Sequence, residues 1–536
     1  MKKSIKKLAA AGLSITSIAS LLACGSSSTT STTESTTAGK EIEKPELITV
    51  MEDNTVTESN GAQAFYDYMQ QLTGLNIKWI HPDHSGYYDT VANAFTSEDT
   101  MPDVVLLSSD YYSVYASNGM LWNMTDAYNN SELKSSGRLV STANDVVNAC
   151  YVAGEDGKKA LYGFPTQQGG GSVTYVKSSW LKEAGIDKSE LEGKTLDWNT
   201  YYGYLKKMAD AKQHYVISSP GFVSANAPYT NYLPEFYQDA QFSFYENSQG
   251  KYVDGFTEQA MKDALARIRT GVVDGVLDKE SVNNSTANCR DKWFSVSPDS
   301  ESGVFTYWAG DWTYTMQSTL EKRNLDTDVI MLNPIKELGA YLNTLPTTWS
   351  ITSACKNPEG VYKYFIETML DGGDIQEAWT YGAKGTHWDT IAETVTLQDS
   401  DTSTTYKDGE FHHLPSPEKP YQLQMKNHID PLLALAKYKD TPQTPNGDDP
   451  GSNVIPEVSK NAEQFFLEHS KMDVALPVNS DLSENITDIN QARTYVVSQV
   501  ALGYMTVDEG MKQYTDVVGS KVDAALKSLN TQFAGK

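Results

Sequence analysis

The chain has 536 residues, with 69 Asp and Glu against 43 Lys and Arg and a formal net charge of −26 at pH 7. This acidity argues against binding to nucleic acid, whose phosphates require Lys and Arg, and against docking on anionic lipid, which requires a polybasic patch. Residues 41–536 are too many for one hydrophobic core, so two or more domains are expected.

The N-terminus is typical of an export signal. Four lysines within residues 2–7 precede an apolar run, Leu8 to Ala23, that Gly, Ser and Thr interrupt. A membrane-spanning helix needs about 20 predominantly apolar residues, so residues 1–23 are predicted to be a cleaved signal peptide. The run ends in Leu21-Leu22-Ala23-Cys24, which resembles the lipobox of bacterial lipoproteins. The resemblance implies that Cys24 is lipid-modified; the alternative is an ordinary leader that contains a cysteine.

A Ser- and Thr-rich segment continues the chain to residue 40. It has almost nothing to bury and cannot offset its ordering entropy, so residues 24–40 are predicted to be a disordered linker behind the lipidated cysteine.

Strand and helix patterns then alternate. The first expected elements are a strand at 47–51, a helix at 61–73, a strand at 75–80, a helix at 87–95 and a strand at 104–107. Further along we expect a strand at 173–176, a helix at 200–211 capped by Asp197 or Asn199, a helix at 257–272, strands at 304–307 and 329–332, a strand that starts at 351 and a helix from 358 to 370. The alternation predicts an α/β protein, and residues 456–536 are predicted to be a helical tail.

Aromatic and cysteine content add two expectations. The chain holds 32 Tyr and 10 Trp but only 15 Phe. Tyr and Trp combine a flat apolar face with a polar group, which suits pyranose sugars, although Tyr can also replace Phe in cores. The three cysteines of the body, Cys150, Cys289 and Cys355, are too few and odd in number for a disulfide framework, so buried free thiols are expected, with a single bridge as the alternative.

Four stretches together resemble one family. They are Met101-Pro102-Asp103-Val104-Val105 followed by Asp110 and Gly119-Met120-Leu121; Tyr162-Gly163-Phe164-Pro165 followed by Trp180 and Gly185; Gly310-Asp311-Trp312; and Trp379-Thr380-Tyr381-Gly382-Ala383-Lys384-Gly385-Thr386-His387-Trp388. The chain is similar to the extracellular solute-binding lipoproteins of ABC sugar importers, the large Gram-positive type related to maltose-binding protein.

The resemblance implies a periplasmic-binding-protein-like fold, with two α/β lobes that are joined by hinge strands and close on a ligand, plus a helical C-terminal decoration. Lobe 1 is expected to comprise 41–170 and about 340–395, and lobe 2 to comprise 171–339 and part of 396–536. The resemblance implies no catalysis and no cofactor. No calcium loop of the type that some relatives carry follows Trp198, and His81-Pro82-Asp83-His84 lacks the further ligands of a metal site.

Ligand-binding candidates follow from the resemblance and from the ends of predicted strands. The candidates are Asp53, Asn54, Asp110, Tyr111, Gln167, Gln168, Asp311, Trp312, Trp349 and Trp388, with Tyr87, Tyr88 and Tyr112 as further possibilities. Each has an ordinary alternative: Asp110 can cap a helix, the tryptophans can fill cores, and the glutamines can lie in a solvated loop. His387 is expected to be a structural hydrogen-bonding residue.

The sequence therefore predicts a monomeric, lipid-anchored protein on the outer face of the cytoplasmic membrane, which captures an oligosaccharide and delivers it to the transmembrane subunits of an ABC permease. The alternatives are a binding protein for a peptide or another polar solute and, as a third class, a surface glycoside hydrolase.

Overall fold

The structure is a computed structural model that describes residues 41–53, 61–83, 86–137, 139, 141–166, 169–222, 232–390, 395–399, 402–406, 411–413 and 457–535. The predicted signal peptide, Cys24 and the linker lie outside these residues. In the described part of the chain, no helix combines the length and the apolar character that a membrane span requires.

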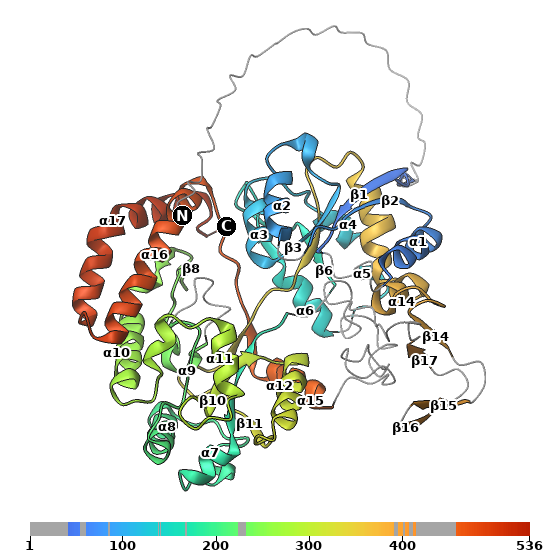
Figure 1. The fold of residues 1–536 in the computed structure, drawn as a ribbon. Coiled ribbons are helices and arrows are strands. Elements are labelled where there is room, and N and C mark those ends of the chain that lie inside the picture. The colour runs from blue at the N-terminus through green and yellow to red at the C-terminus, as the bar shows by residue number, and fades with distance from the viewer. Residues whose placement is uncertain are drawn as a thin grey trace, which may run out of the picture. The chain divides into compact units, whose positions relative to one another are not determined.

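Lobe 1 is built on a five-stranded sheet in the order β2-β1-β3-β13-β6. Strand β1 pairs in parallel with β2 and β3, whereas β13 pairs antiparallel with β3 and β6. The elements, shown in Figure 1, are β1 (Leu47–Met51), α1 (Ala62–Thr73), β2 (Asn76–Ile80), α2 (Tyr87–Ala94), β3 (Val104–Leu107), α3 (Ser109–Ser117), α4 (Thr125–Asn129), α5 (Glu132–Ser135), α6 (Ser141–Ala149), β4 (Tyr151–Ala153), β5 (Lys159–Leu161), β6 (Gly163–Pro165), β13 (Thr348–Ile351), α13 (Pro358–Val361), a π-helical turn (Tyr362–Ile366), a 3-10 turn (Glu367–Leu370) and α14 (Asp374–Tyr381).

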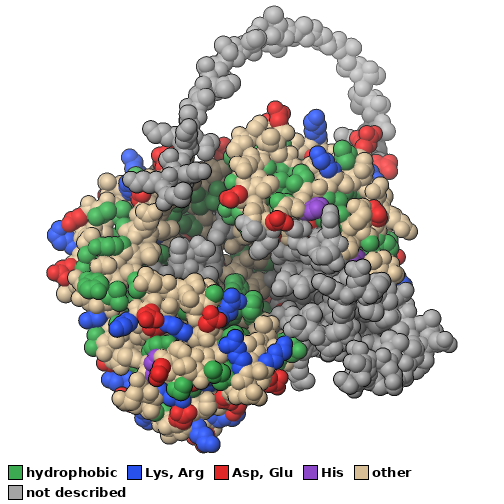
Figure 2. Space-filling model, viewed as in Figure 1, with side chains coloured by type: hydrophobic (Ala, Val, Ile, Leu, Met, Phe, Trp, Pro, Cys, Tyr) green, Lys and Arg blue, Asp and Glu red, His purple; other side chains and the backbone are tan. Residues whose placement is uncertain are grey.

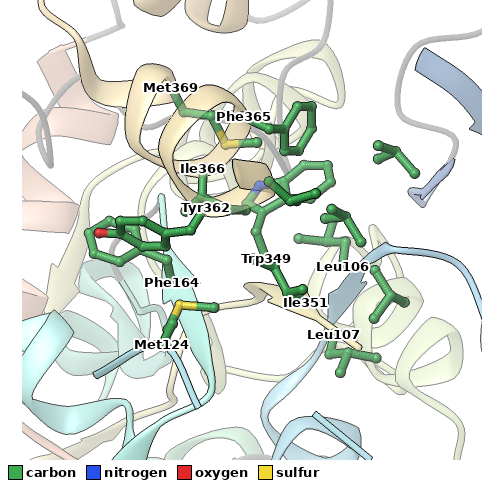
Figure 3. Close-up of a cluster of buried hydrophobic side chains, with 14 of the residues drawn as sticks. Leu106, Leu107, Met124, Phe164, Trp349, Ile351, Tyr362, Phe365, Ile366 and Met369 are labelled. Carbon is green, nitrogen blue, oxygen red and sulfur yellow. The ribbon is translucent and has the colours of Figure 1, made fainter. Parts of the chain in front are cut away.

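The core of lobe 1 is apolar and rich in aromatic rings. All four residues of β3 are buried, as expected for a strand covered on both faces. Figure 3 shows Trp349 among Leu106 of β3 and Phe365 of the π-helical turn. The Trp349 ring lies 5.5 Å from the ring of Trp379, centroid to centroid, and 5.9 Å from that of Phe365. This packing joins the sheet to the helices that follow it in sequence.

Lobe 2 is built on a three-stranded antiparallel sheet in the order β10-β7-β11. Its elements are β7 (Ser172–Lys177), α7 (Ser178–Glu183), α8 (Trp198–Lys212), α9 (Pro234–Tyr237), β8 (Phe244–Glu246), β9 (Tyr252–Asp254), α10 (Gln259–Val273), α11 (Thr286–Trp293), β10 (Val304–Trp308), α12 (Asp311–Lys322) and β11 (Val329–Met331). Side chains alternate between the two faces of β7, so Val176 belongs to a core with residues of α8 and α10, while Val173 and Tyr175 belong to a core with residues of α11 and α12.

The C-terminal elements pack on lobe 2. They are α15 (Glu457–Glu468), β18 (Ser470–Met472), α16 (Ser480–Leu502) and α17 (Val507–Gln532). Val496 and Val500 of α16 share a core with Leu265 and Ile268 of α10. Figure 2 shows hydrophobic side chains on the outer face of this helical pair, where Tyr495 and Val517 are exposed. Two small antiparallel pairs complete the described chain: β14 (Trp388–Thr390) with β17 (Phe411–His413), and β15 (Val395–Asp399) with β16 (Thr402–Tyr406).

Three segments lie side by side where the chain passes between the sheets of the two lobes. The first is 169–171, before β7, the second is β12 (Tyr341–Asn343), and the third is β18, which pairs in parallel with β12. The Thr344 N–H donates to the Gly170 carbonyl at 2.9 Å. A Cβ on Gly169 would lie 2.1 Å from the Thr344 carbonyl oxygen and from Asn343 Oδ1, so this close approach requires glycine.

Most of the predicted elements are confirmed within a few residues. Asp197 is the N-cap of α8, and its side chain accepts from the Thr200 N–H at 2.9 Å. The prediction of a strand that begins at 351 is wrong, because β13 ends there. Four residues of β13 are buried between two antiparallel neighbours, and Trp349 is one of them. Residues 447–455, whose Gly, Asp and Pro content predicts a loop, lie outside the described residues.

Candidate functional site

The first part of the candidate site lies at the carboxyl edge of the lobe 1 sheet. Asp53 follows β1, and Ser108 follows β3. The Tyr88 hydroxyl oxygen accepts a hydrogen bond from the Ser108 N–H at 3.0 Å, and the rings of Tyr88 and Tyr111 are stacked with centroids 4.3 Å apart and planes 12° apart. Both tyrosines are half-buried. Burial, together with the negative charge of Asp53, raises the pKa of Tyr88, so its phenol stays protonated.

A second carboxylate belongs to the residue directly after β1. Glu52 is fully buried at the end of β1, and its Oε1 accepts from the Tyr66 hydroxyl at 2.9 Å. Burial and then the Glu52 charge raise the pKa of Tyr66. The Tyr66 ring stacks on Trp79 at 4.6 Å, centroid to centroid, which fixes the phenol at this edge. The carboxyl edge of lobe 1 therefore holds two acidic side chains, Glu52 bonded to Tyr66 and Asp53 near Tyr88.

Lobe 2 supplies a second aromatic group at the end of β10. The half-buried Trp312 of α12 meets Tyr307 of β10 edge to face, with ring centroids 5.3 Å apart. The Arg290 guanidinium lies over the Trp312 ring at 5.3 Å from its centroid and over Tyr307 at 5.9 Å. Trp308 is also half-buried, with its ring within 3.5 Å of the position that a Cβ on Gly170 would take. Rings and planar polar groups of this kind can hold a polar ring-shaped ligand.

His387 lies in the interior of the protein, close after α14, rather than at an exposed edge. It is fully buried, and its Nδ1 accepts from the Ala383 N–H at 2.8 Å. The proton of the neutral ring is therefore assigned to Nε2, which faces Gly61 so closely that a Cβ there would lie 2.4 Å away. This is the structural hydrogen-bonding role predicted for His387, whose ring also packs against Gly61 at the start of α1.

The structure describes only some of the predicted ligand-binding residues. Asp53 and Tyr111 lie together at the lobe 1 edge, and Trp312 lies in the lobe 2 group. Three residues, Asn54, Gln167 and Gln168, lie outside the described residues, as do the side chains of Asp110, Asp311 and Trp388. Trp349 is 0% exposed in the lobe 1 core and presents no face to a ligand in this structure. Trp349 is therefore a residue of the lobe 1 core and not of the candidate site.

Two aromatic residues of these groups are not among the main sequence candidates: Tyr88 is named only as a further possibility, and Trp308 is not named. The signal for Tyr88 was its position in the helix that precedes β3, which brings its phenol back to the strand end. The signal for Trp308 was its position between the β10 strand and the Gly310-Asp311-Trp312 motif. Placing Tyr88 and Trp308 next to the other candidate residues requires knowing which strands are neighbours and in what register they pair.

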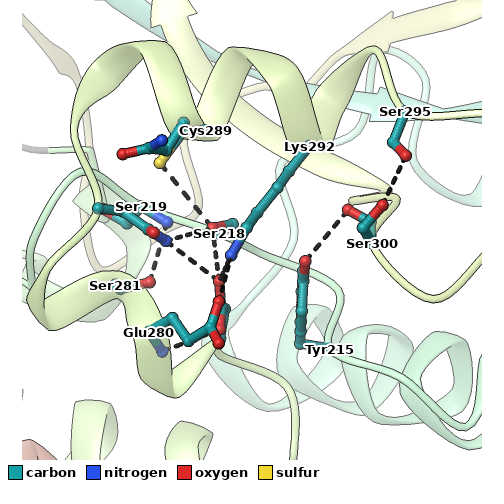
Figure 4. Close-up of polar contacts among 12 residues, drawn as sticks. Tyr215, Ser218, Ser219, Glu280, Ser281, Cys289, Lys292, Ser295 and Ser300 are labelled. Carbon is teal, nitrogen blue, oxygen red and sulfur yellow. Dashed lines mark hydrogen bonds and ion pairs between the residues drawn. The ribbon is translucent and has the colours of Figure 1, made fainter. Parts of the chain in front are cut away.

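A buried polar network in lobe 2 has the residue types of a reactive site but not its chemistry (Figure 4). Asp278 Oδ2 accepts from Ser218 Oγ at 2.8 Å and pairs with Lys292 Nζ at 2.6 Å, and Cys289 Sγ lies 3.8 Å from Ser218 Oγ. Burial raises the pKa of the Cys289 thiol to about 11, so the thiolate nucleophile is scarce at neutral pH. The network ties the chain after α8 to the segment before α11 and to α11 itself.

The three cysteines of the body are free, with Cys150 and Cys289 buried and Cys355 partly exposed. This confirms the prediction of free thiols, and it confirms their burial for Cys150 and Cys289 but not for Cys355. In the part of the chain that the structure describes, no group of three or more His, Cys, Asp or Glu side chains is arranged to hold a metal ion.

Comparison with known proteins places the chain in a family. A family model described as bacterial extracellular solute-binding protein matches residues 55–371, more than half of the chain. The chain therefore belongs to the bacterial extracellular solute-binding proteins. No curated protein matches it.

Several solved structures share the fold. An extracellular solute-binding protein family 1 structure from Alicyclobacillus acidocaldarius is 15% identical, with a TM-score of 0.53 over 90% of this chain and 99% of that one. The N-glycan transport solute-binding protein of Streptococcus pneumoniae is 14% identical, with a TM-score of 0.57 over 91% and 99%. An ABC-transporter-associated solute-binding protein of Bifidobacterium longum infantis, which binds HMO, is 13% identical, with a TM-score of 0.56 over 91% and 99%. These likenesses confirm the predicted two-lobe, periplasmic-binding-protein-like fold.

Proposed function

We propose that the protein is the substrate-binding component of an ABC importer, and that it captures an oligosaccharide and delivers it to the permease. The observation that carries the proposal is the pairing of half-buried aromatic rings with carboxylates or a guanidinium in both lobes: Tyr88 and Tyr111 with Asp53, and Trp312 with Arg290. Ring faces bury the apolar faces of pyranoses, and the charged groups bind hydroxyls. Similar folds in proteins named for N-glycan transport and for HMO binding support this ligand class.

The proposed contact residues are Asp53, Asn54, Tyr88, Asp110, Tyr111, Gln167, Gln168, Trp308, Asp311, Trp312 and Trp388. Gly169 to Gly171 and β12 supply the segments about which the lobes close. Closure excludes water from the ligand, and binding involves no bond cleavage.

A thermal-shift panel of plant and host oligosaccharides, with peptides of matched size, tests the ligand class. We expect stabilisation by at least one oligosaccharide and by no peptide, because a ligand that binds only the folded state raises the melting temperature. The bound sugar should also shift small-angle scattering toward a more compact form and remain intact on prolonged incubation. Stabilisation by peptides alone would favour a peptide-binding protein, and cleavage of the sugar would favour a glycoside hydrolase.

We further propose that the mature protein is a monomer anchored by lipid on Cys24 to the outer face of the cytoplasmic membrane. The lipobox-like Leu21-Leu22-Ala23-Cys24 and the Ser/Thr linker support this proposal. Cys24→Ser should accumulate as unprocessed or soluble protein in cell fractionation, whereas Cys355→Ser should fractionate as wild type. Lipid labelling of the Cys24→Ser protein at the wild-type level would contradict the assignment.

A further inference from the structure

Glu235 is a buried carboxyl group at the junction of three segments of lobe 2. It is 1% exposed in α9. Thr174 Oγ1 of β7 donates to Glu235 Oε1 at 2.7 Å, and the Tyr341 hydroxyl of β12 lies 3.4 Å from the same oxygen. The chain enters lobe 2 through β7 and returns toward lobe 1 through β12, so Glu235 contacts both passages.

The surroundings of Glu235 supply hydroxyl groups rather than positive charge. The titratable side chains that face it are Tyr341 of β12 and the fully buried Tyr201 of α8. Arg267 of α10 packs against α9, but its guanidinium binds the carbonyl oxygens of Phe236 and Tyr237 at 2.7 and 3.2 Å. Among the described residues, no Lys, Arg or His side chain forms an ion pair with Glu235. An ionised carboxylate at this place would be both desolvated and without a cation.

We propose that Glu235 is a pH-sensitive latch: its neutral carboxyl holds α9, β7 and β12 together, and its ionisation loosens this end of lobe 2. The Tyr341 hydroxyl also donates to the Leu332 carbonyl at 2.8 Å, and the Thr174 hydroxyl lies 2.9 Å from that of Thr306. Thr174 already donates its hydroxyl hydrogen to Glu235, so its partner Thr306 is the donor between the two threonines. A negative charge on Glu235 would draw the Tyr341 hydroxyl hydrogen toward the carboxylate and away from the Leu332 carbonyl. The effect would spread along β7 and β12, the passages between the lobes.

The direction of the pH dependence follows from burial. Burial raises the pKa of Glu235 to about 7, while the hydrogen bonds from Thr174 and Tyr341 act in the opposite direction. The same group in an unfolded chain titrates near the ordinary value of about 4.3. Between these values the folded protein keeps a proton that the unfolded chain has released. The Glu235 contribution to stability therefore falls as pH rises from the ordinary value to about 7, and it is constant above that.

Thermal unfolding of the ligand-free protein between pH 5 and 8.5 tests the latch without any assumption about the ligand. Glu235→Gln keeps the shape and the neutral state, so its melting temperature should lack the decrease that the wild type shows as pH rises to about 7. The wild type should be destabilised relative to Glu235→Gln as pH rises to about 7, by a constant amount above it. Glu192→Gln, at an exposed position, serves as the matched control and should follow the wild type. Parallel profiles of the wild type and Glu235→Gln would overturn the proposal.

Thr174→Val and amide hydrogen exchange test the latch even if Glu235→Gln fails to fold. Thr174→Val removes a hydrogen bond that favours the ionised carboxylate, so the midpoint of the transition should move to higher pH. Amide hydrogen exchange, corrected for its intrinsic pH dependence, should quicken above the midpoint in β7, β12 and α9 but not in the lobe 1 strands β1 and β3. An unmoved midpoint, or uniform exchange changes in both lobes, would contradict the latch.

Discussion

The two lobes bury different kinds of side chain. Lobe 1 surrounds β1, β3 and β13 with apolar and aromatic residues, and its buried carboxylates Glu52 and Asp53 lie at the strand ends. Lobe 2 encloses ion pairs within its helical layers, including Asp254 with Arg493 and Asp278 with Lys292. A five-stranded sheet covered on both faces supplies a large apolar core. Lobe 2 has a smaller sheet of three strands, and its helices α16 and α17 are joined to β9 by the buried Asp254 carboxylate, which pairs with Arg493 and accepts from the Tyr514 hydroxyl.

The largest expected effect concerns the ion pair that joins α16 to β9. Arg493 is 0% exposed, donates from Nη2 to Asp254 Oδ1 at 2.7 Å, and lies 4.7 Å from the centroid of the Phe244 ring. Arg493→Ala leaves the Asp254 charge buried without its cation and should lower the free energy of unfolding of lobe 2 by about 3–5 kcal/mol. Denaturant unfolding would measure it. Lys512→Ala, in an exposed pair on α17, is the control with little expected change.

If Arg493→Ala lowers the free energy of unfolding no more than the control Lys512→Ala does, the stability of lobe 2 does not depend on this charge pair. Lobe 1 offers a check on the contrast. The buried residues of lobe 1 form a cluster separate from those of lobe 2. The melting of lobe 1 should therefore be unaffected by Arg493→Ala if the two lobes unfold separately.

An intermediate effect is expected at the boundary between the lobes. Gly169→Ala places a methyl group against the Thr344 carbonyl and the Asn343 side chain, so it should cost about 1–3 kcal/mol of stability through overpacking. Gly86→Ala is the matched control, because nothing lies within 4 Å of its added Cβ. Differential scanning calorimetry would compare the two variants. Equal melting temperatures would show that segment 169–171 can move away from Thr344 with little loss of stability.

The smallest expected effect on stability accompanies a large effect on binding. Trp312→Ala removes a half-buried ring at the lobe 2 edge. It should lower the affinity for the oligosaccharide at least about tenfold, since burial against an aromatic face is worth about 1–3 kcal/mol. Tyr504→Ala removes a 73% exposed ring at the end of α16 and should leave the affinity unchanged. Titration calorimetry with the sugar that the panel identifies would decide. An unchanged affinity of the Trp312→Ala protein would remove lobe 2 from the proposed site.

Local patterns predicted the alternating elements of lobe 1 and the cap of α8, because strand runs and helix caps depend on neighbouring residues. Trp349 shows where this reasoning ends. A tryptophan after Pro-Thr-Thr resembles a residue at the mouth of a strand, yet β13 inserts antiparallel between β3 and β6 and takes the ring into the core. Tyr88 shows the converse, since only the fold returns its phenol to the Ser108 amide and its ring to Tyr111.

The sequence by itself determined the class of fold, the resemblance to solute-binding proteins and the prediction of an export signal, because these depend on periodicity, composition and short motifs. Only the tertiary structure decided which aromatic rings keep a partly exposed face and which fill a core. It also placed Glu235 between β7 and β12 and Arg493 beside Asp254, residues far apart in the chain. The physical reason is that burial, and with it the state of a carboxyl or the use of a ring, depends on what packs around a side chain from distant parts of the sequence.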